Sequence, residues 1–343
     1  MGHKNIIFSI LLIVIICINA SAQNPGYRFN WSNLKNPVLE YPEWSIKDYG
    51  CVFHNDTFFV FFSAFYFDNG AVRSHVVEVT TTDFIHYSEP VLNDAGTDRG
   101  FFGLCSPDVS KIGDTWYLTY NSWVKSYNDE QTFLYYRTSK DLKNWGPDMP
   151  LAKNLTNRDD RKVGAIDGVL YKKSGTWFLL YKENRILKEG KLVKDRQVAR
   201  VAQSVSPDSA FHWIKDGFPS FSMTDGKDNG FLHENFQFFT FRGKFHVLTS
   251  DYWPFFPWIY QIAEKGKKPL NWMNWKNGFK LELPQEPFNS ETRGNGACLI
   301  KDAKGNVLMK DGYVYILYAG TVPMDAGINV SKFCRKGGTT NWE

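Results

Sequence analysis

The feature that most constrains the fold is an internal repeat. Five segments each join a tight turn containing Gly or Asp to a run in which aromatic and aliphatic residues alternate. This pattern is typical of a hairpin turn that leads into a β-strand. The segments are HNDTFFVFFSAF (54–65), KIGDTWYLTYNSW (111–123), KKSGTWFLLYKEN (172–184), TFRGKFHVLTSDY (240–252) and MKDGYVYILYAGT (309–321).

A second, weaker signature closes each unit with a polar turn followed by an aromatic residue. It occurs as TTDFIHYSEP (81–90), SKDLKNWGPD (139–148), SPDSAFHWIKD (206–216), NWMNWKNG (271–278) and GGTTNWE (337–343). Long helical periodicity is absent, and Pro and Gly punctuate the chain throughout. Five similar four-stranded units predict an all-β fold, a five-bladed β-propeller, with a β-sandwich as the alternative.

The start of the chain predicts export. It has a basic first stretch, an apolar run from Ile6 to Ile18 and the small residues Ala20-Ser21-Ala22, which is the pattern of a secretory signal peptide. The apolar run is short for a membrane span, although an uncleaved anchor is the alternative. We therefore expect a signal peptide at residues 1–22 and a single propeller domain at 23–343. The mature protein should be secreted or periplasmic, without a membrane span, and a monomer.

Charge and cysteine content exclude some classes of function. The formal net charge is +4 and the basic residues are dispersed, so no nucleic acid partner is expected. After the leader, four cysteines are scattered singly at 51, 105, 298 and 334, without zinc spacing. Buried free thiols are the preferred interpretation, and one disulfide is the alternative in an oxidising compartment.

The repeat also organises the acidic residues. In a propeller the first strand of each blade lines a central channel, so equivalent residues of successive blades lie close together. Asp48, Asp108, Asp167 and Glu234 stand 9, 7, 9 and 10 residues before the repeat anchors at 57, 115, 176 and 244. Gathering carboxylates in a channel raises the pKa of at least one of them. Glycoside hydrolysis needs such a pair, one protonated and one ionised.

Each of these acids also has an ordinary structural interpretation. Asp48 could cap a turn, Asp108 could be a loop residue, and Asp167 could form an Asx-turn before Gly168. Glu234 could be an exposed charge at the end of a strand. Four coincidences in nearly the same register favour the functional interpretation.

These residues resemble the glycoside hydrolase family 43 group of five-bladed propellers, which cleave arabinose- and xylose-containing polysaccharides by inversion. By this resemblance Asp48 is similar to the general base of the first blade. Asp167 in AIDGVLY is similar to the third-blade Asp that adjusts the acid's pKa, and Glu234 to the fourth-blade general acid. Asp108 in SPDVSKI matches a second-blade Pro-Asp, which implies substrate binding.

The sequence departs from that family at several points. Asp48 lacks a following Pro, Gly168 stands where Pro is usual, and Glu234 is followed by Asn235-Phe236 rather than Gly-Pro. Asn295 stands about where many members place a His that binds a metal or water. No cofactor or metal site is expected, with a structural or axial Ca²⁺ as the alternative.

A second resemblance is to family 117, propellers that cleave α-linked anhydrogalactose from agar fragments. There a His beside a Glu on the fourth blade takes the acid's role, which implies His233 as the acid. Neighbouring strand residues point to opposite faces, so only one of His233 and Glu234 should face the channel unless a bulge intervenes. The sequence favours Glu234, and His233 stays a candidate for substrate contact.

Aromatic and basic residues could extend the site. The candidates for a sugar platform are Trp44, Phe101, Phe102, Trp123 and Trp253, and Arg293 could bind hydroxyl groups. The expected partner is an oligosaccharide or polysaccharide substrate. Two other classes stay open: a non-catalytic sugar-binding propeller, and a scaffold for protein partners, which would need no acidic ring.

Overall fold

The structure is a computed structural model that describes most of the chain. Among the described residues, no helix is long and apolar enough to cross a membrane. The expected signal peptide at residues 1–22 lies outside the described residues. These are 34–125, 130–157, 162–188, 191–194, 198–215, 219–223, 233–251, 255–264, 272–289, 294–310, 313–323 and 333–342.

The described strands form five sheets. The sheets follow one another along the chain, except that β20 joins the first sheet. The first is ordered β20-β1-β2-β3-β4, with β1 (Ser45–His54), β2 (Thr57–Asp68), β3 (Ala71–Thr81), β4 (Leu92–Asp94) and β20 (Lys301–Asp302). The second is ordered β5-β6-β7-β8, with β5 (Gly103–Ile112), β6 (Thr115–Trp123), β7 (Leu134–Ser139) and β8 (Met149–Leu151).

The other three sheets follow in chain order. The third holds β9 (Lys162–Lys173), β10 (Thr176–Lys188), β11 (Lys191–Lys194), β12 (Val198–Ser204) and β13 (His212–Trp213). The fourth holds β14 (Ser220–Met223), β15 (His233–Phe241), β16 (Lys244–Asp251), β17 (Pro257–Glu264) and β18 (Asn274–Lys280). The fifth holds β19 (Asn295–Leu299), β21 (Met309–Lys310), β22 (Tyr313–Pro323) and β23 (Phe333–Trp342). The described helical turns are α1 (Lys153–Thr156), η3 (Thr97–Arg99) and η4 (Pro287–Asn289).

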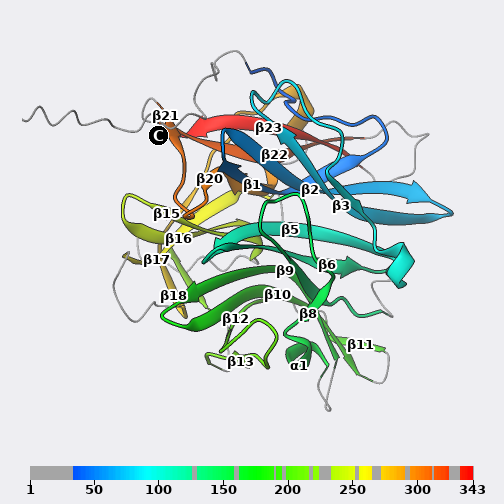
Figure 1. The fold of residues 1–343 in the computed structure, drawn as a ribbon, viewed down its shortest axis with the longest axis vertical. Coiled ribbons are helices and arrows are strands. Elements are labelled where there is room, and N and C mark those ends of the chain that lie inside the picture. Colours follow the sequence, from blue (N-terminus) through cyan, green and yellow to red (C-terminus); the bar gives the residue numbers. More distant parts are fainter. Residues whose placement is uncertain are drawn as a thin grey trace, which may run out of the picture.

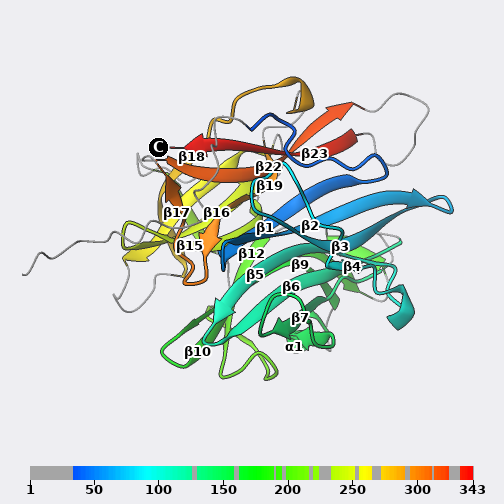
Figure 2. The same ribbon diagram turned by 45° about the horizontal axis from the view of Figure 1, so that its top comes forward.

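The sheets are arranged in a ring around a central channel. Five apolar clusters form the core, and each lies between one sheet and the next. The cluster that contains Cys51 and Cys298 joins the fifth sheet to the first, and Figures 1 and 2 show β22 and β23 beside β1 and β2. The ring therefore closes between the two ends of the described chain, and the predicted all-β propeller is confirmed.

The predicted number of blades, five, is wrong. Among the described residues four sheets contain the complete four-stranded unit, so the structure shows four complete blades. In the fifth sheet β22 is central, with β23 on one side and both β19 and β21 on the other, so that it is only three strands wide. Its closing signature, GGTTNWE, lies within and just after β23 instead of leading to a fourth strand.

Four of the five predicted tight turns are confirmed, and the fifth, at 311–312, lies outside the described residues. Two residues separate the paired ends of the first and second strands at Asn55-Asp56, Gly113-Asp114, Ser174-Gly175 and Arg242-Gly243. The closing signature is also a true structural repeat. The hydroxyl of Thr81 accepts the backbone N–H of Phe84 at 2.9 Å, and that of Ser139 accepts the N–H of Leu142 at 3.0 Å.

Candidate active site

Each innermost strand carries a β-bulge near its start, and this bulge builds the site. At every bulge one residue has left-handed backbone geometry, which Gly, Asn and Asp tolerate best. These residues are Asp48 (φ 58°), Ser106 (φ 55°), Asp167 (φ 57°), Asn235 (φ 53°) and Gly296 (φ 56°). The bulges therefore turn equivalent residues of the five sheets toward one end of the channel.

The bulges correct the predicted register of the acids. Only Asp48 and Asp167 occupy the bulge position, which Ser106 holds in the second sheet and Asn235 in the fourth. Asp108 follows its bulge residue by two positions, and Glu234 precedes its own by one. The prediction of four carboxylates at equivalent positions is therefore wrong, because the bulge and not the approximate spacing sets the equivalence.

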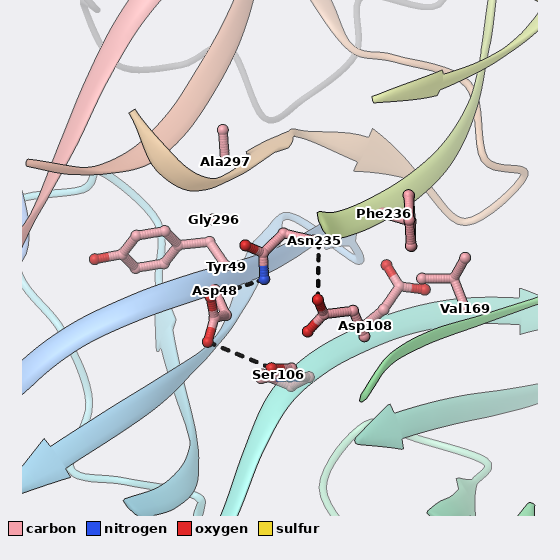
Figure 3. A pocket seen from close by; sticks show the side chains of 11 residues that line it. Asp48, Tyr49, Ser106, Asp108, Val169, Asn235, Phe236, Gly296 and Ala297 are labelled. Carbon is pink, nitrogen blue, oxygen red and sulfur yellow. Dashed lines mark hydrogen bonds between the residues drawn. The ribbon is translucent and has the colours of Figure 1, made fainter. Parts of the chain in front are cut away.

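A pocket with about 270 Å³ of empty space opens at this end of the channel. Its lining includes Asp48, Ser106, Asp108, Asp167 and Asn235. Figure 3 shows the side chains of Asp48 and Asn235 directed toward one another across this space, with Ser106 beside them. The structure therefore brings together three of the four predicted carboxylates in the pocket lining.

The side chain of Asp48 is almost completely buried, and four neighbours hold it in one orientation. Its Oδ2 accepts hydrogen bonds from Ser63 Oγ at 2.9 Å and from Ser106 Oγ at 3.5 Å. Its Oδ1 accepts a hydrogen bond from Asn235 Nδ2 at 2.9 Å and lies 3.2 Å from Lys47 Nζ. These contacts fix the positions of both carboxylate oxygens.

Asp167 lies in a different environment. Its Oδ2 accepts the backbone N–H of Asn235 at 3.1 Å, and its own N–H donates to Asn121 Oδ1 at 3.2 Å. The pKa of Asp167 is raised to about 6, chiefly by burial; the charges of Glu234 and Asp48 also raise it, whereas the ammonium groups of Lys182 and Lys47 lower it. The clustering of acids was thus predicted to raise a pKa, and it does so at Asp167.

Glu234 lies at the edge of this group. Its side chain is buried, and Oε2 pairs with Nζ of Lys182, which reaches it from β10 of the third sheet. The carbonyl oxygen of Glu234 accepts a hydrogen bond from Thr249 Oγ1 at 2.7 Å. Glu234 is close enough to influence the pKa of Asp167, but it does not line the pocket in this structure.

Asp108 faces the interior of the channel below the other acids. Its Oδ1 lies 3.7 Å from Lys301 Nζ, and its Oδ2 accepts a hydrogen bond from Ser110 Oγ at 3.3 Å. Burial raises the pKa of Asp108, and the ammonium group of Lys301 opposes that shift. The structure therefore places Asp108 at the bottom of the pocket rather than at its mouth.

His233 is packed into the body of the fourth blade. Its ring lies 4.2 Å from that of Phe221, and its Nε2 is 3.2 Å from Tyr260 Oη. Burial lowers the pKa of His233 to about 3, so the ring is neutral near pH 7. Because His233 and Glu234 point to different sides of the strand, the structure brings only Glu234 to the group of acids.

The predicted aromatic platform is dispersed. Trp44 packs against Tyr41 with ring centroids 4.9 Å apart, and Trp123 donates its indole N–H to the carbonyl of Val72 at 2.7 Å. Neither Trp44 nor Trp123 lines the pocket. The guanidinium of Arg73 covers Phe102 at 4.3 Å. Phe101 packs edge-on against Tyr135 at 4.9 Å. Trp253 and Arg293 lie outside the described residues.

Several residues of the site were not foreseen from the sequence. Ser106, Asn235, Ser63, Lys47 and Lys182 all contact the acids. A signal for two of them existed, since Ser106 and Asn235 precede the repeat anchors at 115 and 244 by nine residues, as Asp48 and Asp167 precede theirs. Nothing local marks Lys182, which lies on the neighbouring strand of another blade.

The described residues contain no group of three or more His, Cys, Asp and Glu side chains arranged to hold a metal ion. Asn295, which stands about where many family 43 members have a His that binds a metal or water, is buried in β19. Its Oδ1 has no hydrogen-bond partner among the described residues. The cations that face the carboxylates here are ammonium groups of lysines.

No protein-family model and no curated protein matches this sequence. Solved structures do match it over most of its length. A thermostable family-43 glycoside hydrolase is 14% identical, covers 89% of this chain and 91% of its own, and has a TM-score of 0.58. An α-L-arabinofuranosidase from Podospora anserina is 13% identical, with 90% and 93% covered and a TM-score of 0.54.

A third match comes from the GH130 family of mannoside phosphorylases, which contains glycoside hydrolases. It is 14% identical, covers 88% of this chain and 84% of its own, and has a TM-score of 0.55. The chain has the β-propeller fold of these proteins. At such identities the likeness shows the fold alone, and the reaction that the protein can catalyse depends on the residues of the site.

Proposed function

We propose that this protein is a glycoside hydrolase that cleaves arabinose- or xylose-type glycosides of plant or algal polysaccharides with inversion at the anomeric carbon. One observation carries the proposal. Buried carboxyl groups of the first, third and fourth blades gather beside one pocket, and their mutual repulsion contributes to the raised pKa of Asp167. Such a grouping is costly for stability and is the arrangement that glycosidases use.

In the proposed reaction Asp48 is the general base. Its carboxylate removes a proton from a water molecule while the water oxygen attacks the anomeric carbon. The hydrogen bonds from Ser63 and Asn235 orient Asp48 for this step. Oδ1 of Asn235 is buried and has no partner among the described residues, so it can accept a hydrogen bond from a substrate hydroxyl or from the water.

Glu234 is the general acid in this proposal. It gives its proton to the glycosidic oxygen as the bond to the anomeric carbon breaks, which leaves a carboxylate. Its ion pair with Lys182 fits the state after donation, because the ammonium group stabilises that carboxylate. Asp167, which has an N–H bond from Asn235 and lies near Glu234, adjusts the charge around the acid. We assign no proton transfer to His233, which is neutral and packed against Phe221.

Substrates with different leaving groups distinguish the role of Glu234 from that of Asp48. A nitrophenolate group leaves without being protonated, whereas a sugar alkoxide must be protonated as it leaves. Glu234→Gln should therefore lose about 10²- to 10⁴-fold in kcat on an oligosaccharide but much less on a nitrophenyl glycoside. Asp48→Asn should lose about as much on both substrates, because both need an activated water. Aryl arabinosides, xylosides and galactosides and agar oligosaccharides form the substrate panel.

Glu282→Gln, at an exposed side chain, is the matched control and should keep wild-type rates. NMR of the first product formed reads the anomeric configuration. Inversion requires the Asp48 and Glu234 carboxyl groups to stand roughly 6.5 to 9.5 Å apart when substrate is bound. A retained configuration, or equal losses in Glu234→Gln on both substrates, would contradict these roles.

A second candidate is a non-catalytic sugar-binding propeller. The position of Glu234 favours it, because its Oε2 is engaged by the ammonium group of Lys182 and its side chain does not line the pocket. In this case the wild-type protein binds sugars from the panel without turning over any of them. We also propose that the protein is exported from the cell that produces it, on the strength of the leader pattern in residues 1–22. The exported protein is proposed to be a monomer.

A further inference from the structure

A second pocket lies at the opposite end of the central channel. Its empty volume, counted together with the solvent space at its mouth, is about 490 Å³. The acidic pocket is lined by residues near the starts of the innermost strands, such as Asp48 and Asp167, whereas this one is lined by later residues such as Val52 and Leu170. At about 3.3 Å per residue, these positions lie on the order of 10 Å apart along the channel.

The lining of this second pocket is basic. Lys111, Lys301 and Lys304 are among its lining residues, and Asp302 is its one carboxylate among the described lining residues. The ammonium group of Lys111 lies 5.3 Å from the ring centroid of Trp116, which does not line the pocket. Asp302 is already engaged by its own turn, because Oδ1 accepts the backbone N–H of Lys304 at 2.8 Å and that of Asn306 at 2.9 Å. The positive charge in the pocket is therefore not balanced within its own lining.

Lys301 forms the floor between the two pockets. Its side chain is 3% exposed. Nζ donates to the carbonyl oxygen of Phe238 at 3.2 Å and lies 3.7 Å from Asp108 Oδ1, and the described residues offer it no other partner. An ammonium group has three N–H donors, so one remains for a ligand. A buried charge with an incomplete set of partners is costly, and an anion would complete that set.

Most of the remaining lining is aromatic or aliphatic, and Ser110 and Thr240 add hydroxyl groups. Tyr171, Phe238 and Phe245 form one part of it, and their rings pack together in the core between the third and fourth sheets. A site with ammonium groups on one side and apolar rings on the other suits an anion carried on an organic skeleton better than a bare inorganic ion.

We propose that this pocket binds a small organic anion, with a carboxylate or sulfate group held by Lys111, Lys301 and Lys304 and the skeleton against Tyr171 and Phe238. In a protein that acts on glycans, uronic acids and sulfated sugars have this chemistry. The site is separate from the carboxylates of the acidic pocket, so only the choice of sugars as probes, and not the binding of an organic anion, rests on the proposed function.

Isothermal titration of the full-length protein tests the proposal, with D-glucuronate and galactose 6-sulfate as the charged probes and D-glucose as the neutral one. At least one charged sugar should bind with a Kd in the millimolar range or tighter, and D-glucose should not bind at this site. The double variant Lys111→Gln/Lys304→Gln removes two charges near the surface and spares the buried Lys301. It should weaken binding of the charged sugar about tenfold or more.

Lys143→Gln is the matched control, because Lys143 is an exposed lysine of the second blade outside the pocket. It and Asp48→Asn, at the acidic pocket, should both keep wild-type affinity for the charged sugar. Absence of binding at about 20 mM ligand, or equal affinity in the double variant and in Lys143→Gln, would overturn the proposal. Inorganic sulfate that binds as tightly as the sugars would refute the role of the apolar wall.

Discussion

At the scale of single residues, the site shows how two equivalent aspartates acquire different properties. Asp48 and Asp167 both occupy bulge positions and both are buried. Asp48 receives three side-chain hydrogen bonds and lies beside Lys47, whereas Asp167 receives one backbone N–H and faces two other carboxyl groups. The two aspartates therefore have different hydrogen-bond partners and neighbouring charges, although their positions in the fold are equivalent.

The raised pKa of Asp167 predicts a pH-dependent cost to stability. Its pKa is about 6 in the folded protein and 3.8 in the ordinary case, so ionisation is less favourable after folding. Stability from this group is fully present below about pH 4 and is lost as the pH rises through about 6. The asparagine of Asp167→Asn is neutral at all pH values. The free energy of unfolding of this variant, minus that of wild type, should therefore be about 1–3 kcal/mol larger at pH 7.5 than at pH 4.

Urea unfolding at the two pH values measures this difference. Asp114→Asn, in an exposed hairpin turn, is the control for the chemical change alone. For each variant, the free energy of unfolding relative to wild type is compared between pH 4 and pH 7.5. If its increase is no larger in Asp167→Asn than in Asp114→Asn, then the pKa of Asp167 is not raised by folding. A stabilised but inactive variant would show that the acid is kept for function at a cost to folding.

At the scale of elements, the decisive feature is the bulge in the first strand of each sheet. The sequence predicted the strands and their turns because aromatic alternation and Gly or Asp turns have short-range causes. It also led to Asp48 and Asp167, which precede their repeat anchors by nine residues. Its spacing was less exact for Asp108, which lines the same pocket but follows the bulge residue of its strand by two positions, because a bulge adds one residue to a strand.

The fifth sheet shows a second limit of the sequence. Its bulge residue, Gly296, precedes the anchor at 313 by 17 residues, because β20 and β21 are inserted between β19 and β22. β20 leaves its own sheet and pairs with β1 in the first one. The partner of Glu234 was equally unpredictable, since Lys182 meets it only after two blades have packed together. Spacing along the chain carries no information about such contacts.

The bulge of β19 gives a test of how tightly the site is built. A Cβ atom on Gly296 would lie 2.4 Å from the backbone nitrogen of Asp48 and 2.6 Å from its Cα, and φ at Gly296 is 56°. Gly296→Ala should therefore lower the free energy of unfolding by roughly 2–4 kcal/mol, from steric overlap and backbone strain together. It should also reduce any activity by moving Asp48.

Gly113→Ala is the control for that substitution. Gly113 has a similar φ of 62°, but a Cβ there meets nothing within 4 Å. Its cost should be about 1 kcal/mol, from the backbone conformation alone. Thermal and urea unfolding of the two variants compare the costs, and equal losses of stability would refute the close approach of β19 to β1.

At the scale of the whole molecule, the sheets form a closed ring with two unlike ends. One end gathers Asp48, Asp167 and Glu234, and the other has an excess of lysines, with the pair of Asp108 and Lys301 between them. The sequence indicated the first end through a repeat in the acids. The second end was hidden, because Lys301 reaches the channel from β20, a strand that has no counterpart in the repeat.

Closure of the ring predicts the behaviour of the cysteines. Cys51 on β1 and Cys298 on β19 are 0% exposed and lie in the core between the first and fifth sheets. Both are free thiols, as is Cys105, which agrees with the preferred sequence-based interpretation. Burial raises the pKa of Cys105 to about 12 and those of the other two well above the usual range. Only the thiolate reacts with a disulfide reagent, so the native protein should react very slowly.

The rate of that reaction reports whether the ring opens at its closure before it unfolds. Each sheet packs on two neighbours, so separating the fifth sheet from the first exposes two core faces at once, and we expect no such opening short of global unfolding. Labelling with a chromogenic disulfide, located by mass spectrometry, should therefore reach Cys51, Cys105 and Cys298 over the same urea range in which tryptophan fluorescence changes. Earlier labelling of Cys51 and Cys298 than of Cys105 would instead mark the join between β19 and β1 as the weakest point of the propeller.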